Sequence, residues 1–172
     1  MGLTLELLGN PSIEVDGAPL SVDTRKAVAL LCLLAVRGDR MPRDAVADLL
    51  WPTATPDRAR ASLRRTLSVL TSGLGDRWVA ADRAAIWLDP DDDVDCDVTR
   101  FTTGVATLRA HATAAHPDGE PSACPGCLPT LRSLADAYTG PFLDGFVLRD
   151  APAFDDWVGA RDEALRLSLI HI

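Results

Sequence analysis

Length, composition and charge set the first bounds on this protein. Its 172 residues are enough for one domain with a full core or for two small domains. Hydrophobic residues make up 47% and charged residues 24%, a balance that excludes wholesale disorder. The longest apolar run, Ala27–Val36, is too short to cross a bilayer, and the N-terminus has no signal-peptide pattern. We therefore expect a cytoplasmic protein with no membrane partner.

The net charge of −8 is unevenly distributed along the chain. Residues 1–88 carry 11 basic and 10 acidic side chains, a net of +1, whereas residues 89–172 carry 6 basic and 15 acidic ones, a net of −9. A split of this kind indicates two modules with different partners. All the basic residues except Lys26 are arginines, whose planar donors suit phosphate and guanine.

The first half of the chain predicts short strands, three helices and a hairpin. Leu3–Leu7 and Ile13–Val15 alternate apolar and polar residues, as half-buried strands do, and Asp16-Gly17 is a hairpin signal. Helical periodicity and capping residues then predict three helices, the second with Pro42 in its first turn. The expected elements are strands at 3–7, 13–15 and 18–20, helices at about 25–37, 42–51 and 55–72, and a hairpin of 78–80 with 86–88.

The acidic, turn-rich stretch Asp89–Asp93 is the expected domain boundary. Beyond it, the periodicity predicts helices at about 98–115, 128–138 and 153–167. Phe154 and Trp157 lie three residues apart on one helix face, and we expect them to pack between helices. The last six residues, Leu167–Ile172, match the translation of a sequencing adapter, so we expect a truncated reading frame and exclude them from the fold.

The third predicted helix has an apolar side and an arginine-rich side. Its apolar side consists of Ala59, Leu63, Thr66, Leu67, Leu70 and Leu74. The opposite side holds Arg58, Ala61, Ser62, Arg65, Ser68 and Ser72, with Arg64 at its edge. Small residues let a helix approach the DNA major groove closely, and Arg can reach guanine or phosphate. The pattern alone leaves two interpretations open, a DNA-reading helix and an ordinary solvated helix face.

The order of the predicted elements favours the DNA-reading helix. Short strands, three helices and a two-stranded hairpin are typical of a winged helix-turn-helix, whose third helix reads the groove while the hairpin, or wing, contacts the backbone. Arg77 and Arg83 fall on the predicted wing. The predicted DNA contacts are Arg58, Ser62, Arg64, Arg65 and Ser68 on the helix and Arg83 on the wing.

Four other cations in this half have two interpretations each. Arg60 either joins the DNA-binding side or pairs with an acid such as Asp48 or Asp57. Three more lie near helix starts and are either phosphate contacts or surface cations. These three are Arg25, Lys26 and Arg43.

An ordered set of short motifs extends along both halves of the chain. The set consists of Leu7–Gly9, Val15–Gly17, Arg25–Ala27, Leu34-Ala35, Leu49–Pro52, Ala59-Arg60, Leu63-Arg64, Leu67, Tyr138–Phe146, Phe154–Trp157 and Arg161. Taken together, these motifs resemble the SARP-type antibiotic regulatory transcription activators, which join an OmpR-like winged helix to a bacterial transcriptional activation domain. The resemblance covers nearly the whole chain, up to about residue 166.

The resemblance implies a two-part architecture and a regulatory function. It implies an α+β winged helix-turn-helix domain at residues 1–90, followed at residues 91–166 by part of an all-α, tetratricopeptide-like activation domain, with 167–172 outside both. The family's activators of secondary metabolism bind direct repeats in double-stranded promoter DNA, copies lying head to tail, and engage RNA polymerase. The competing hypothesis is a protein-interaction or scaffold fragment of a larger regulator with little DNA binding of its own.

Two histidines and two cysteines in the second half need separate consideration. His111, His116, Cys124 and Cys127 have the spacing H-x4-H-x7-C-x2-C, which is not that of a standard zinc finger. The set is compatible with a structural zinc site, with plain loop thiols or with a redox pair. The sequence contains no Ser/His/Asp set, HExxH motif or glycine-rich phosphate loop, so we expect no enzyme and no other cofactor.

Overall fold

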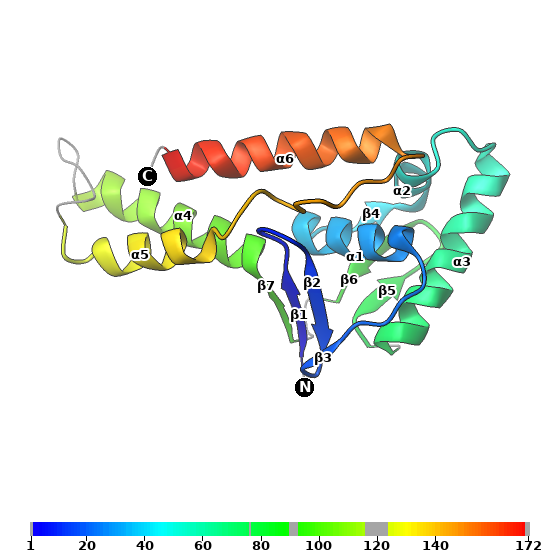
Figure 1. Ribbon diagram of the computed structural model, residues 1–172, viewed down its shortest axis with the longest axis horizontal. Helices are drawn as coiled ribbons and strands as arrows, with labels where there is room; N and C mark the ends of the chain where they lie inside the picture. Colours follow the sequence, from blue (N-terminus) through cyan, green and yellow to red (C-terminus); the bar gives the residue numbers. More distant parts are fainter. Residues whose placement is uncertain (1, 76, 90–92, 116–123, 171–172) are drawn as a thin grey trace.

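The computed structural model describes residues 2–75, 77–89, 93–115 and 124–170. Within these ranges the protein is an α+β structure with six helices and two small sheets (Figure 1). No helix in the described part of the chain is both long and apolar enough to span a membrane. Its first half contains β1 (Leu3–Glu6), β2 (Ser12–Val15), β3 (Ala18–Pro19), α1 (Arg25–Arg37), β4 (Met41–Pro42), α2 (Arg43–Leu50), α3 (Pro56–Leu74), β5 (Val79–Ala81) and β6 (Ala85–Leu88).

The second half adds one strand and three helices. These elements are β7 (Val94–Cys96), α4 (Asp97–Ala115), α5 (Leu128–Ala137) and α6 (Pro152–Ile170). The helices predicted from periodicity are therefore present, each within a few residues of its expected bounds. We expected residues 167–172 to lie outside the fold. Instead, α6 continues to Ile170, and Leu169 packs against the core. Their suggested origin in a sequencing adapter stays a prediction.

The two sheets bring together strands that are distant in sequence. One sheet has the order β3-β2-β1-β7, with β2 antiparallel and β7 parallel to β1. The other has the order β4-β6-β5, all antiparallel. Neither β4 nor β7 was predicted from the sequence. The prediction that Pro42 lies in the first turn of a helix is wrong, because Pro42 pairs in β4 with Ala85 and only precedes α2.

Helix α1 lies at the centre of the core because it is apolar around most of its surface. Eight of its residues are buried, including the whole run Ala29–Ala35. The Thr24 side chain accepts a hydrogen bond from the Ala27 amide at 3.3 Å, and Gly38 ends the helix in the left-handed conformation. One continuous core joins this helix to the β1–β2 sheet, to α3 and to the helices of the second half.

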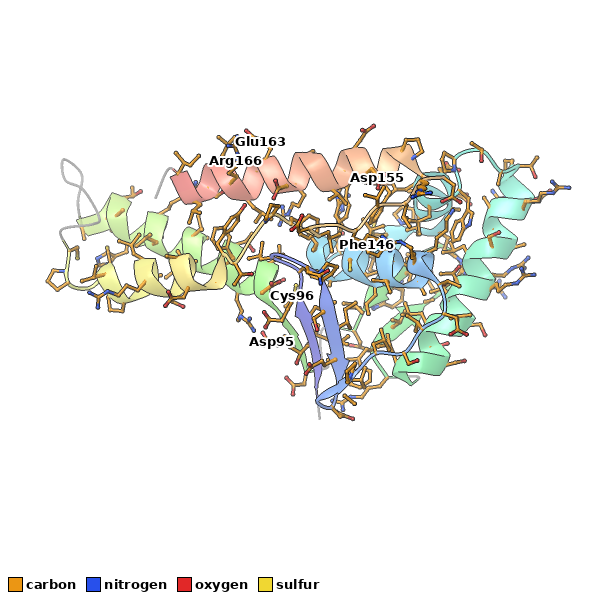
Figure 2. All side chains as sticks on the ribbon, viewed as in Figure 1. Asp95, Cys96, Phe146, Asp155, Glu163 and Arg166 are labelled. Carbon is orange, nitrogen blue, oxygen red and sulfur yellow. The ribbon has the colours of Figure 1, made fainter. Side chains whose placement is uncertain are left out.

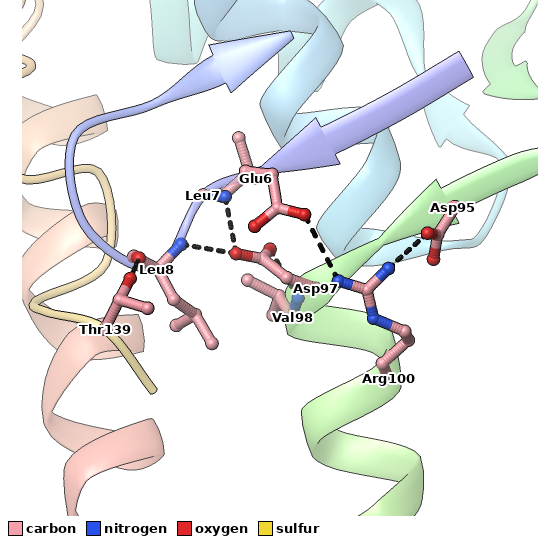
Figure 3. Close-up of polar contacts among 8 residues, drawn as sticks. All are labelled: Glu6, Leu7, Leu8, Asp95, Asp97, Val98, Arg100 and Thr139. Carbon is pink, nitrogen blue, oxygen red and sulfur yellow. Dashed lines mark hydrogen bonds and ion pairs between the residues drawn. The ribbon is translucent and has the colours of Figure 1, made fainter. Parts of the chain in front are cut away.

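A buried carboxylate joins the end of β1 to the start of α4. The Asp97 side chain accepts hydrogen bonds from the amides of Leu7 and Leu8, each at 2.7 Å, and from Val98 at 2.6 Å (Figure 3). Burial raises the pKa of Asp97, while these three donors oppose that shift. Because β7 and Asp97 both contact the first strand, the second half is built directly onto the first sheet.

Backbone hydrogen bonds hold the segment between α5 and α6 against the residues that follow β1. Gly9 donates to the Pro141 carbonyl at 2.9 Å, and Leu143 donates to the Leu7 carbonyl at 2.8 Å. A Cβ at Gly140 would lie 3.2 Å from the Gly9 Cα, a tighter contact than most Cβ atoms make, so this close approach favours glycine. Phe142 and Leu143 of this segment are buried, and Phe146 is half-buried.

Candidate nucleic-acid interface

Helix α3 has the two sides that its sequence predicts. The buried residues are Ala59, Leu63, Thr66, Leu67, Leu70 and Leu74, all six of the expected apolar side. Of the predicted DNA contacts on this helix, Arg58, Arg64, Arg65 and Ser68 are exposed and Ser62 is half-buried. The helix lies at the opposite end of the molecule's long axis from α4 and α5, whereas α6, also in the acidic half, starts beside α2 (Figure 1).

The arginines nominated for DNA contact have no charge partner among the residues that the structure describes. In the described part of the chain, no hydrogen bond or ion pair involves the side chain of Arg58, Arg64, Arg65 or Arg83. No acidic residue follows Asp57 along α3. The helix therefore presents cations that no internal carboxylate neutralises, which is the electrostatic condition for binding a polyanion.

Arg60 differs from these arginines because it is paired. Its guanidinium contacts Asp44 on α2 through Nε–Oδ1 at 2.8 Å and Nη2–Oδ2 at 3.3 Å. The pairing lowers the pKa of Asp44 and raises that of Arg60. Asp57, at 3.7 Å, is a secondary partner, and the principal partner Asp44 was not among those predicted. No local signal identifies Asp44, since its position opposite Arg60 depends on how α2 packs on α3.

Arg83 lies in a tightly held turn between β5 and β6. The Asp82 carboxylate accepts hydrogen bonds from the amides of Ala84 and Ala85 at 2.8 and 2.7 Å, which lowers the pKa of Asp82. Arg40 pairs with the same carboxylate and stacks over the Trp87 ring at 3.6 Å. The exposed Arg83 therefore sits on a rigid support.

A surface hollow connects the turn to α3. It has a volume of about 590 Å³ and lies where α2, the start of α3 and the β5–β6 turn meet. Its lining residues are Arg43, Asp44, Asp57, Arg60, Leu63, Arg64 and Arg83. The structure thus brings two predicted contacts, Arg64 and Arg83, to one cavity with four arginines and two aspartates. From the sequence, these two arginines were predicted on separate elements, the third helix and the wing, and not close to each other.

Two other candidate cations make internal contacts. Lys26 is only 16% exposed, donates to the Leu50 carbonyl at 2.6 Å and pairs with Asp150 at 2.8 Å. Its ammonium group therefore caps the C-terminal end of α2. Arg25 donates to the Val147 carbonyl at 3.2 Å and lies over an aromatic ring of the same loop. Both residues hold the loop before α6 against the first half.

Three of the four predicted metal-ligating residues lie together. His111 on α4 and the cysteines of the turn before α5, Cys124 and Cys127, have ligand atoms that all lie within 4.8 Å of one another. The hydrogen bond from His111 lowers the pKa of the Cys124 thiol to about 6. The fourth, His116, lies outside the described residues. Cys32 and Cys96 are buried elsewhere in the core.

Comparison with known proteins gives a structural match. No protein-family model matches the chain, and no curated protein matches it by sequence. The solved structure of Mycobacterium tuberculosis EmbR in complex with a low-affinity phosphopeptide matches with a TM-score of 0.71 and 27% sequence identity. The match covers 96% of this chain and 43% of the EmbR chain.

The chain shares its fold with a SARP-family regulator. EmbR combines an OmpR-like winged helix with a bacterial transcriptional activation domain, so the match confirms the resemblance found in the sequence motifs. EmbR is itself a transcriptional regulator. Because this chain spans less than half of the EmbR chain, the partners of the whole regulator remain matters for proposal.

Proposed function

We propose that the protein is a sequence-specific DNA-binding transcriptional activator that reads promoter direct repeats through α3 and recruits RNA polymerase. In this proposal, Arg58, Ser62, Arg64, Arg65 and Ser68 face the major groove. Arg83, on the β5–β6 wing, contacts the backbone beside it. A second copy binds the neighbouring repeat head to tail. The direct repeats and the polymerase contact in this proposal rest on the family resemblance, which the EmbR match supports.

The observation that carries the DNA-binding proposal is the set of exposed, internally unpaired arginines on a narrow helix face. Small residues alternate with the arginines on α3, since Ala61, Ser62 and Ser68 share that face. This composition allows close approach to base edges, where a bidentate Arg contact to guanine discriminates by about 1–3 kcal/mol. The rigid turn below Arg83 keeps a further cation at a fixed distance from the helix.

The two halves of the chain are proposed to have different functions, DNA binding in the first and protein contact in the second. Residues 1–90 form the OmpR-like winged-helix domain, and residues 91–166 form the first part of a tetratricopeptide-like activation domain. The net charge of −9 on residues 89–172 supports this division, because an acidic surface repels DNA and is free to contact protein. The pairing of β7 with β1 means that the activation domain starts on the sheet of the DNA-binding domain.

The same acidic half favours one competing function, a protein-interaction fragment with little DNA binding of its own. Under that hypothesis, α3 is an ordinary solvated helix and the helical half docks partners. The two functions differ in what the α3 arginines do, so substitution of these arginines separates them.

The test begins with selection of binding sites from a randomised duplex DNA library, followed by mobility-shift titration of the selected site. We expect enrichment of a direct repeat and a loss of affinity of at least about 30-fold for the double variant Arg64→Ala/Arg65→Ala. The matched control is Arg132→Ala/Arg166→Ala, which makes the same change in net charge on the acidic half and should bind like the wild type. Failure to enrich any sequence, or equal binding by both double variants, would favour the protein-interaction function.

A further inference from the structure

The cluster formed by His111, Cys124 and Cys127 is separate from the proposed DNA-binding face. His111 stands in the penultimate turn of α4, and the two cysteines flank the turn that leads into α5. The cluster therefore lies where α4 and α5 meet, at the end of the molecule far from α3 (Figure 1). Its residues come from α4 and from the turn before α5.

The spacing of the ligand atoms is close to that of a tetrahedral zinc site. Zinc bond lengths to sulfur and to imidazole nitrogen place these two atoms about 3.6 Å apart around a tetrahedral ion. The Cys124 Sγ and His111 Nε2 atoms are 3.7 Å apart, and all three ligand atoms lie within 4.8 Å of one another. Small side-chain rotations would therefore be enough to bring all three ligand atoms to one ion.

The local backbone presents both thiols to the same point. The amides of Cys127 and Leu128 both donate to the Cys124 carbonyl at 3.1 Å, which folds the Cys-Pro-Gly-Cys sequence into a tight turn. Gly126 borders the cluster, because a Cβ there would lie 3.6 Å from Cys124 Sγ and 3.8 Å from His111 Nε2. A glycine at this position leaves room beside the ligand atoms.

We propose that His111 Nε2, Cys124 Sγ and Cys127 Sγ bind a structural Zn²⁺ ion that ties the end of α4 to the start of α5. Two thiolates and one imidazole form a donor set that selects zinc over magnesium or calcium. Binding displaces the thiol protons and joins two helices that are consecutive but separated by a long connection. These three side chains supply all but one of the four ligands of a tetrahedral site.

The proposed ion would connect α4 and α5 at the end of this helix pair that lies away from the Phe101–Tyr138 contact. At the other end, the Phe101 and Tyr138 rings are 5.7 Å apart, and a Cβ on Gly104 would clash with Leu134 at 2.8 Å. Those contacts bring the helices together near the β1–β7 sheet. Zinc would fix the relative position of their distant ends, and so the surface that this helix pair offers to a protein partner.

The first experiment measures metal in the whole chain, purified under reducing conditions from zinc-supplemented medium. Elemental analysis should find zinc stoichiometric with protein in the wild type and none in His111→Ala or Cys124→Ser. The matched control is Thr113→Ala, an exposed neighbour on the same helix, which should retain stoichiometric zinc. We avoid substituting Cys127, because this residue is buried and its loss could unfold the helix pair for other reasons.

The second experiment adds Co²⁺ to metal-free protein and records its absorption. A thiolate-to-cobalt charge-transfer band with the visible bands of tetrahedral cobalt is expected, reversed by zinc. Loss of a direct ligand in His111→Ala should weaken zinc binding by more than about 100-fold, because even outer-shell substitutions weaken it 10–100-fold. A wild type without zinc, unchanged binding by both variants, or a Cys124–Cys127 disulfide in the reduced preparation would overturn the proposal. Since α3 is not involved, either outcome leaves the DNA-binding test independent.

Discussion

Helices α3 and α6 have the same length, 19 residues, but use their charges differently. On α6, Asp162 accepts a hydrogen bond from the Phe142 amide at 2.7 Å and Asp155 accepts one from the Leu148 amide at 3.0 Å. Glu163 and Arg166 pair with each other on the outer surface, as Figure 2 shows. On α3, in contrast, four arginines lie within the first half of the helix, and only Arg60 has an internal partner within the described residues.

The comparison separates charges that build the fold from charges that remain available to a partner. The carboxylates of α6 hold the loop 141–148 against the helix, where backbone amides would otherwise lack acceptors. Within the described residues, Arg58, Arg64 and Arg65 of α3 make no hydrogen bond or ion pair. Because these exposed side chains have no partner there, their charges remain available to DNA. This is the main physical reason to propose them as DNA contacts.

The largest expected effect on stability comes from the core side of α6. Phe154 is fully buried, and its ring centroid lies 6.2 Å from that of Phe146 and 5.4 Å from that of Trp157. Phe154→Ala should lower the free energy of unfolding by about 3–5 kcal/mol, because it removes a large apolar side chain and leaves a cavity. Urea denaturation measures the loss. Val147→Ala, at a position 51% exposed, is the control and should change stability by less than about 0.5 kcal/mol.

A smaller effect is expected where an α6 carboxylate accepts a backbone amide. Asp162→Ala should cost about 1–3 kcal/mol of unfolding free energy, because the part-buried Phe142 amide loses its acceptor. Glu163→Ala, at the next residue, removes only a surface ion pair and should cost less than about 1 kcal/mol. Equal losses in these two variants, measured by the same denaturation, would remove the distinction drawn between structural and surface charges on α6.

The smallest effect on stability is expected on α3. Arg64→Ala/Arg65→Ala should leave the free energy of unfolding within about 0.5 kcal/mol of the wild-type value, because both side chains are exposed and unpaired. Thermal and urea denaturation check this. A large loss of stability would mean that these arginines support the fold, and the contrast with α6 would disappear.

Periodicity predicted the helices and the two sides of α3 because those features depend on local sequence. The six buried residues of α3 follow directly from helical spacing. Strand β7 could not be predicted in the same way, since its three residues lie beside an acidic stretch and pair with β1 from the other end of the first half. The buried Asp97 was missed for the same reason, because its amide partners are about ninety residues away.

The candidate sites show the same limit. Exposure of Arg58, Arg64 and Arg65 could be predicted from the helical wheel, whereas the meeting of Arg64 and Arg83 at one hollow required the packing of the β5–β6 turn. The Cys124-x-x-Cys127 spacing suggested a metal site, and the fold supplied the position of His111 beside it. Residue type and spacing nominate ligands, but tertiary structure decides which of them meet.

The central claim, that the unpaired arginines of α3 face DNA, is tested most directly by the salt dependence of binding to a duplex of unselected sequence. The measurement is the slope of log K against log salt concentration, by fluorescence anisotropy, for the wild type, Arg64→Ala/Arg65→Ala and the control Arg132→Ala/Arg166→Ala. Each phosphate contact that is lost should flatten the slope by about 0.9. We predict a flattening of about 1–2 for the α3 variant and none for the control. An α3 variant with the wild-type slope and affinity would contradict the account.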